Sequence, residues 1–352
     1  MSAPTVSRTP RSRGEIDAAL RRRVSVSTGR GDLLGLRHAT LLLFAAFVLI
    51  IGLAGPANLR YGLIFSTVYA VAILGNNAIA ATLEEINLSG GAFIAFGAYT
   101  TMLALEAGLN VFVAMLLALV VAAGIGAVFA VPTTRLTGLA TALVTFTLAF
   151  SIIDLTNYLT PITGGDAGRQ VSLDAGFAGL RFSGSRPGML VLVVAVMVLV
   201  GLAHLWLLHR KPGRVAIAVG EAESASSVFG ANIPLVKVAV WTWAAGLGGL
   251  AGALYALAVG YVSSSQWPIM MSILVFVGGL IGGTRSATGA WIGGIIVGGL
   301  PLWLQNIVPA TATSVLFGVI IIVALLAGGK GIAELGERLL TRGWHLVGRG
   351  RS

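Results

Sequence analysis

The chain has 352 residues, of which 56% are hydrophobic and only 10% are charged, and its formal net charge is +10. Soluble domains typically carry about 25% charged residues, so this composition excludes an ordinary soluble protein. The absence of cysteine excludes disulfides, iron–sulfur clusters and thiolate metal sites. Basic residues in chains this apolar usually fix membrane topology, so no nucleic-acid partner is expected.

Apolar segments close to membrane-spanning length recur along the whole chain. They predict an all-α integral membrane protein, a polytopic helical bundle with about 8–10 transmembrane segments. They lack the alternation, over about 10 residues, that is typical of barrel strands. The expected segments are 39–54, 62–82, 89–107, 111–131, 138–158, 189–208, 234–259, 269–283, 288–308 and 312–328.

Two of these segments match the pattern of a full membrane-spanning helix less well than the others. Segment 89–107 begins in Ser-Gly-Gly, and segment 269–283 is short and ends in Gly-Gly-Thr-Arg. We expect each to be a broken or re-entrant helix, which is tolerated only where protein or a cavity covers its backbone.

Basic residues predict the topology. With the N-terminus inside, 19 of the 23 Lys and Arg residues lie on the inner side, and Arg60, Arg169, Arg181 and Arg186 lie outside. The positive-inside rule therefore places both termini in the cytoplasm. We expect an Arg-rich cytoplasmic tail (1–37), a membrane domain (38–330) and a cytoplasmic C-terminal tail (331–352). The first tail lacks the compact pattern of a cleavable signal peptide.

The loop 209–237 is the longest polar interval in the second half of the chain. The predicted topology places it in the cytoplasm, where such a loop is suited to contact a soluble partner. It carries His209, Arg210, Lys211 and Arg214, then Glu221 and Glu223, and then small residues up to Gly230.

Few ionisable residues fall near membrane depth, where each costs about 2.5–3.5 kcal/mol on insertion scales. Glu84 and Glu85 either line a polar break between helices or are solvated at an inner helix end. Asp154 either lines an outer vestibule or caps a helix at the headgroups, and Glu106 is expected at the outer interface.

Catalytic and nucleotide-binding motifs are missing from the sequence. It contains no HExxH, no GxSxG and no GxxxxGK[ST] motif, and its four histidines are scattered. Transport is therefore expected rather than catalysis, with no metal and no cofactor in this chain.

Several glycine-containing and polar motifs follow one another along the chain. They are Leu74–Asn77, Asn87–Phe93 and Phe96–Tyr99, then Arg135–Leu139 with Thr147–Phe150, then Thr163–Gly168, Gly249–Ala256 and Gly278–Gly289. In this order they resemble the motifs of the permeases of branched-chain amino-acid ABC importers, in a wider group with urea, amide and simple-sugar permeases. The resemblance covers about Leu74 to Gly331. It implies a multi-pass subunit of a bacterial inner membrane that forms a translocation path for branched-chain or related amino acids.

The polar loop is similar to the coupling loop of this family, in which a short helix docks on an ATPase. The matching positions are Arg214, Glu221, Glu223, Ala225 and Gly230. The resemblance implies two cytoplasmic ABC ATPase subunits that bind ATP and Mg²⁺, and a solute-binding protein outside the membrane. It also implies a second, related permease subunit, with a homodimer as the alternative.

The break before segment 89–107 is the expected place of the substrate. The translocation path is predicted to include Asn76, Asn77, Asn87, Ser89, Gly90, Gly91 and Asp154. The N-terminus of the half-helix near Ser89 is suited to face an amino-acid carboxylate, because helix N-termini carry partial positive charge.

Three positions depart from the family pattern. Gly90 stands where His or Gln is usual, Gly220 stands where Arg is common, and 327–331 replaces an RPRG-like ending. Substrate identity therefore stays open between amino acids and another small polar solute such as urea, an amide or a sugar. A secondary transporter and a membrane enzyme are the remaining alternatives.

Overall fold

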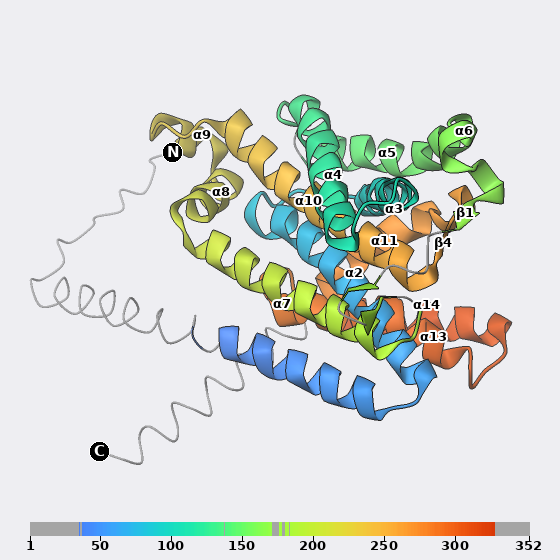
Figure 1. Cartoon of the computed structure of the whole chain (residues 1–352). Coiled ribbons are helices and arrows are strands. Elements are labelled where there is room, and N and C mark those ends of the chain that lie inside the picture. Colours follow the sequence, from blue (N-terminus) through green and yellow to red (C-terminus); the bar gives the residue numbers. More distant parts are fainter. Residues whose placement is uncertain are drawn as a thin grey trace, which may run out of the picture.

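The computed structural model describes residues 35–327, apart from 36, 137, 171–175, 178–179 and 183. These residues form a helical bundle (Figure 1). The expectations for nearly all of tail 1–37, for tail 331–352 and for most of the departure at 327–331 lie outside the described residues.

Every predicted segment contains helix. The long helices are Arg37–Ala54, α2 (Ala57–Thr82), α3 (Gly90–Glu106), α4 (Val111–Thr133), α5 (Leu139–Tyr158), α7 (Pro187–His209), α10 (Ile233–Val259), α11 (Ile269–Gly282) and α14 (Ala310–Ala327). The segment predicted at 288–308 ends earlier and is divided into α12 (Ala287–Gly294), a π-helical turn (Ile295–Gly299) and α13 (Leu300–Leu304). Among the described residues, eight helices are long and apolar enough to cross a membrane.

Short elements lie at the two ends of the bundle (Figure 1). One end carries α8 (Lys211–Glu221) and α9 (Glu223–Val228). The opposite end carries α6 (Thr160–Thr163), two 3₁₀ turns (Gly165–Ala167 and Ser264–Gln266), and strands β1 (Arg169–Gln170) and β4 (Tyr261–Val262), which pair antiparallel. A second antiparallel pair joins β2 (Gly176–Phe177) to β3 (Leu180–Arg181).

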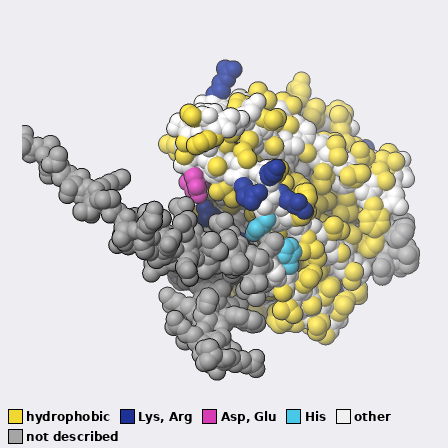
Figure 2. Space-filling model, turned by 90° about the vertical axis from the view of Figure 1, so that its left-hand side faces the viewer, with side chains coloured by type: hydrophobic (Ala, Val, Ile, Leu, Met, Phe, Trp, Pro, Cys, Tyr) yellow, Lys and Arg dark blue, Asp and Glu magenta, His cyan; other side chains and the backbone are white. Residues whose placement is uncertain are grey.

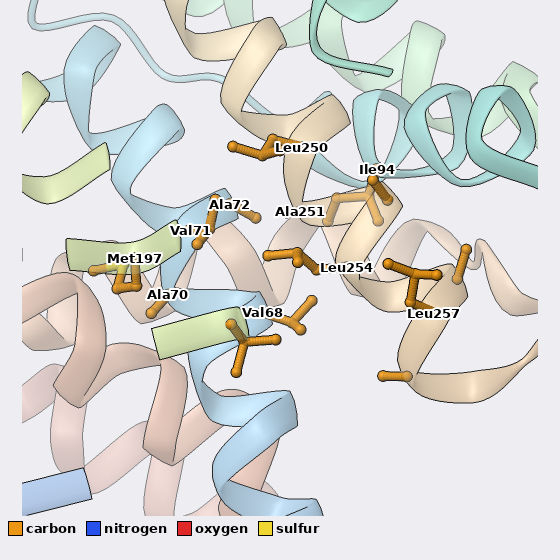
Figure 3. Close-up of a cluster of buried hydrophobic side chains, with 14 of the residues drawn as sticks. Val68, Ala70, Val71, Ala72, Ile94, Met197, Leu250, Ala251, Leu254 and Leu257 are labelled. Carbon is orange, nitrogen blue, oxygen red and sulfur yellow. The ribbon is translucent and has the colours of Figure 1, made fainter. Parts of the chain in front are cut away.

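Helices α2 and α10 form the centre of the bundle. In their most apolar windows 83% and 78% of residues are buried, against 22% in Arg37–Ala54 and 33% in α5. A helix that is apolar on all sides is suited to such a place, because every face meets another helix. Side chains of α2, α3, α7 and α10 meet there, including Val68, Ile94, Met197 and Leu254 (Figure 3).

The central contact between α3 and α10 depends on glycine. A Cβ atom at Gly252 would lie 2.0 Å from the carbonyl oxygen of Ile94, and one at Gly97 would lie 1.9 Å from that of Gly249. Small residues let helix backbones approach in membranes, where packing replaces the hydrophobic driving force. The Gly249–Ala256 motif is therefore a packing motif of this contact.

Both segments that we expected to be incomplete are short. α3 has 17 residues and α11 has 14. At 1.5 Å per residue these helices are about 25 and 21 Å long, less than the roughly 30 Å of a bilayer core. α11 reaches spanning length only together with the 3₁₀ turn that precedes it.

We predict that Gly252→Ala lowers the free energy of unfolding by about 1–3 kcal/mol or more, because the added carbon overlaps a neighbouring backbone. Gly124→Ala in α4 is the matched control, since nothing lies within 4 Å of its added Cβ. The difference is measured by heating both variants in detergent and recording the fraction of each protein that stays monodisperse. Equal stability of the two variants would contradict the assigned close contact.

Candidate functional site

The polar loop 209–237 folds into a helical hairpin of α8 and α9 at one end of the bundle (Figure 1). α8 is amphipathic and buries Gly213, Ala216 and Val219, which follow one another at a spacing of three residues. Arg214, on the other side of α8, is exposed. The hairpin is therefore seated on the bundle by one face and presents the other outward.

Gly220 brings α8 against the end of α2. A Cβ atom at this position would lie 2.1 Å from the carbonyl oxygen of Thr82. Gly220, which departs from the family pattern, thus packs against the bundle. A larger side chain at this position would not fit in this arrangement.

The tip of the hairpin is apolar and exposed. Val228 and Phe229 are 84% and 90% exposed, and Ala225 is exposed beside them. The Ser226 hydroxyl donates to the carbonyl oxygen of Ala218 at 2.9 Å, which holds α9 against α8. Gly230 then ends the hairpin at a φ of +83°. The tip combines small residues with two exposed apolar side chains, which is the composition of a docking surface.

A buried ion network connects the hairpin to the bundle. The Lys237 Nζ atom lies 3.1 Å from Oε1 of Glu85 and 2.9 Å from Oε1 of Glu223. The indole of Trp241 donates to Oε2 of Glu85 at 3.3 Å. Lys237 and Glu85 are 4% and 6% exposed. Three elements, the α2–α3 connection, α9 and α10, are thus joined at one ammonium group.

This network refines the interpretation of the acidic residues. Glu84 is exposed, as expected for a solvated carboxylate, whereas Glu85 is buried and paired. Burial raises the pKa of the Glu85 carboxyl, and the hydrogen bond and charge of Lys237 oppose that rise. Glu223 is committed to a contact within the chain, while Glu221 stays exposed at the end of α8.

The break between α2 and α3 has a tight, defined backbone. Glu84 has a φ of +56°, a conformation that non-glycine residues rarely adopt. Asn87 Oδ1 accepts from the Ser89 backbone N–H at 2.9 Å and from its hydroxyl at 2.6 Å. The Leu88 backbone N–H donates to the Thr145 hydroxyl at 3.1 Å, which ties the break to α5.

The N-terminus of α3 packs against α11. The Gly91 backbone N–H donates to the Ser272 hydroxyl at 2.9 Å, and a Cβ at Gly90 would lie 3.1 Å from Val275. Asn87, Ser89, Gly90 and Gly91 are all buried, and in this arrangement the Gly91 N–H is bonded to Ser272 rather than free for a substrate carboxylate.

Asn76 and Asn77 are buried in α2, about one and a half turns before its end at Thr82. Among the described residues, neither side-chain oxygen has a hydrogen-bond partner. The Asn77 amide donates to the Gly283 carbonyl at 3.5 Å, so this side chain points toward α11. Unpaired buried amide oxygens are uncommon in helices. The Asn77 oxygen packs against α11, because a Cβ added at Gly279 would lie 2.2 Å from it.

Asp154 belongs to a polar stripe on the exposed side of α5. Thr147, Ser151, Asp154 and Tyr158 are exposed and follow one another at the three- and four-residue spacing of one helix face. A carboxylate facing lipid within a span is unfavourable. The stripe therefore indicates that this face of α5 meets water or another polypeptide. The spacing is present in the sequence, where Asp154 is the one carboxylate of the stripe.

The opposite end of the bundle is tied together by polar contacts. Asp166, in the Thr163–Gly168 motif, accepts a hydrogen bond from the Ser264 hydroxyl. Nη1 of Arg169 lies 3.2 Å from Oε2 of Glu106. Arg169 and Glu106 were predicted on the outer side, and Glu223 and Lys237 on the inner side. The alternation of the connections is thus consistent with the predicted crossings.

The sequence matches a known protein family over most of its length. Residues 58–325 match the family described as "Branched-chain amino acid transport system / permease component". The chain belongs to this family. The matched region runs from the start of α2 into α14, so it contains the break, the hairpin and the Lys237 network. The protein is accordingly a multi-pass membrane permease component.

Two curated relatives are similar over the same length. The "High-affinity branched-chain amino acid transport system permease protein LivM" of Salmonella typhimurium is 29% identical over 271 residues, and the protein of that name from Escherichia coli K12 is 28% identical. Each alignment covers 69% of this chain and 64% of the relative. The chain thus matches a little under two thirds of their length. No solved structure matches significantly.

We predict that Lys237→Met lowers the free energy of unfolding by about 3–5 kcal/mol, because it leaves the Glu85 carboxylate buried without its partner. Adding Glu85→Gln to this variant should restore most of the loss. Thermal unfolding in detergent measures both effects, with Arg135→Gln as the control for loss of one exposed basic group. A Lys237→Met protein as stable as the control would contradict the network.

Proposed function

We propose that this chain is a permease subunit of an ABC importer for branched-chain or related amino acids. The observation that carries the proposal is the α8–α9 hairpin, seated on the bundle by α8 and exposing Ala225, Val228 and Phe229 at its tip. Family membership supports the transport class. The relatives' names support the substrate class, and the sequence motif Glu221–Gly230 supports the coupling role.

The proposed orientation follows the basic residues. The hairpin end carries Arg210, Lys211 and Arg214, and the positive-inside rule places such an end in the cytoplasm. Two ATPase subunits, which bind ATP and Mg²⁺, would dock there on this chain and on a related permease. A solute-binding protein would deliver substrate to the opposite end, near Asp166 and Arg169.

The Lys237 network supplies a physical route for coupling. Movement of α9 displaces Glu223, and the same ammonium holds Glu85 in the α2–α3 connection. A shift of the hairpin would therefore displace the α2–α3 connection. There α3 starts, and the hydrogen bonds between Asn87 and Ser89 fix the backbone conformation. In this proposal the break opens when Gly91 exchanges the Ser272 hydroxyl for another partner.

The proposed substrate path runs between the break and the polar stripe of α5. Asn76 and Asn77 contribute acceptors, the backbone at Asn87, Ser89, Gly90 and Gly91 contributes donors once α11 moves, and Asp154 contributes an acceptor for an ammonium group. The exposed face of α5 is then shared with the second permease subunit, which shields the stripe from lipid.

We predict that replacing the hairpin tip, Val228→Ser with Phe229→Ser, weakens association with the ATPase subunits at least about tenfold, since buried aromatic anchors often contribute about 2 kcal/mol. Co-purification from membranes that contain the native partners measures this loss. Ile307→Ser is the control, because Ile307 is 80% exposed in the α13–α14 connection. Normal co-purification of the tip variant, with normal uptake, would contradict the coupling role.

We predict that Asp154→Leu lowers uptake at least several-fold while ATPase co-purification is unchanged, because it removes a charge from the proposed path without touching the hairpin. Uptake of labelled leucine by the reconstituted importer measures the effect. Thr147→Leu is the matched control, since Thr147 is exposed on the same face of α5 but carries no charge. Unchanged uptake would remove Asp154 from the path.

Two outcomes would favour the alternatives. A binding protein that retains urea, an amide or a sugar in a ligand screen, and no branched-chain amino acid, would change the substrate class. Uptake that persists without ATP and collapses with an ion gradient would indicate a secondary transporter instead.

A further inference from the structure

A cavity of about 720 Å³ opens between α2, α4, α7, α8 and α10, on the hairpin side of the bundle. Its volume falls within the roughly 300–1,000 Å³ of ligand pockets. It is separate from the proposed substrate path, because Asn76, Asn77, Asp154 and the residues of the break do not line it. The proposed function thus gives this cavity no role.

The polar groups of the cavity wall bond within the protein. The Thr82 hydroxyl donates to the Ala78 carbonyl at 2.6 Å, and the Thr242 hydroxyl donates to the Val238 carbonyl at 2.7 Å. The Trp243 indole donates to Nδ1 of His204 at 3.4 Å. The described residues that line the cavity include no carboxylate. Such a wall is suited to an apolar chain, because it has few groups left to bind a charged amino acid.

The mouth of the cavity is cationic. Lys211 lines the cavity and is exposed, and His209, Arg210 and Arg214 are exposed at the same α7–α8 corner. Figure 2 shows Lys and Arg side chains gathered beside histidines on this end, next to an extensive hydrophobic surface. From 187 to 220 the sequence contains no acidic residue. An anionic group at this corner therefore meets several positive charges.

Trp206 indicates the depth of this corner in the membrane. Its side chain is 58% exposed, and the Arg210 guanidinium carbon lies 5.0 Å from the centre of its ring. Exposed Trp and Arg side chains at the end of a span are typical of the headgroup level of a bilayer. The mouth thus lies where lipid phosphates are, and the cavity extends from it along α7 and α10.

We propose that the cavity binds an anionic phospholipid, with an acyl chain between α4, α7 and α10 and the phosphate beside Lys211 and Arg214. A second copy of this chain fits the surface less well, because a two-fold contact would bring the same cationic corners together. A lipid satisfies both halves of the site, since its chain matches the wall and its headgroup matches the mouth. Seated against Gly213 and Ala216, it would also support α8.

The test uses the full-length chain purified in detergent and incubated with dioleoyl phosphatidylglycerol or, separately, dioleoyl phosphatidylethanolamine. Native mass spectrometry then counts bound lipids on each protein. The wild type is expected to retain one phosphatidylglycerol at concentrations where phosphatidylethanolamine is lost.

Two variants separate the mouth from the cavity. Lys211→Gln with Arg214→Gln is expected to weaken phosphatidylglycerol binding about 10- to 30-fold, because each basic group at a membrane surface contributes attraction for anionic lipid. Ala239→Phe, at an exposed position that lines the cavity, is expected to abolish the retained lipid. The controls are Arg135→Gln for charge and Val128→Phe for bulk, which do not line the cavity and should bind as the wild type.

Several results would overturn the proposal. Arg135→Gln that weakens binding as much as the double variant would indicate only general surface charge. Unchanged lipid retention by Ala239→Phe would place the lipid elsewhere. A dimer mass that Ala239→Phe abolishes would assign the cavity to a second copy, and displacement of the lipid by millimolar inorganic phosphate would assign the mouth to a free anion.

Discussion

The ammonium group of Lys237 is the contact on which the hairpin end of this protein depends. It compensates two carboxylates at once, one fixed in the connection after α2 and one at the start of α9. A buried charge without its partner is strongly destabilising, so none of the three segments can leave alone without a penalty. The hairpin is thereby an integral part of the bundle. The family match includes the hairpin and the Lys237 network, so both belong to the permease part of the chain.

The two ends of the bundle are held by different chemistry. At the end opposite the hairpin, a strand pair and a carboxylate–hydroxyl contact join the connections after α5 and α10. Aromatic rings lie beneath them, where Tyr255 and Tyr99 both contact Trp267. The ion pair at this end, between Arg169 and Glu106, is partly exposed and therefore screened by solvent, whereas the Lys237–Glu85 pair is buried and is screened much less. A signal that arrives as a moved carboxylate thus acts mainly at the hairpin end.

Much of the fold was predictable, because in lipid every backbone group must be satisfied within a helix and the required length is known. The ten segments, the shortness of 89–107 and 269–283, and the grouping of Glu106 with Arg169 on one side all follow from that constraint. The Lys237 network was not predictable in this way. In the sequence, Lys237 is one of several basic residues expected near an inner helix end. Its partners are 14 and 152 positions away, and nothing in the sequence distinguishes them from the other acidic residues. Likewise, Gly220 stood out as a departure, but only its 2.1 Å approach to Thr82 shows why a side chain is excluded.

The contact of Gly97 with Gly249 has a practical consequence for following movement in this protein. Two helices that touch backbone to backbone cannot slide past each other without first separating, since no flexible side chains lie between them to rearrange. We therefore expect α3 and α10 to move together. Probes attached to this pair would then provide an internal reference distance, against which distances to α5, α9 or α11 can be compared in different states of the transporter.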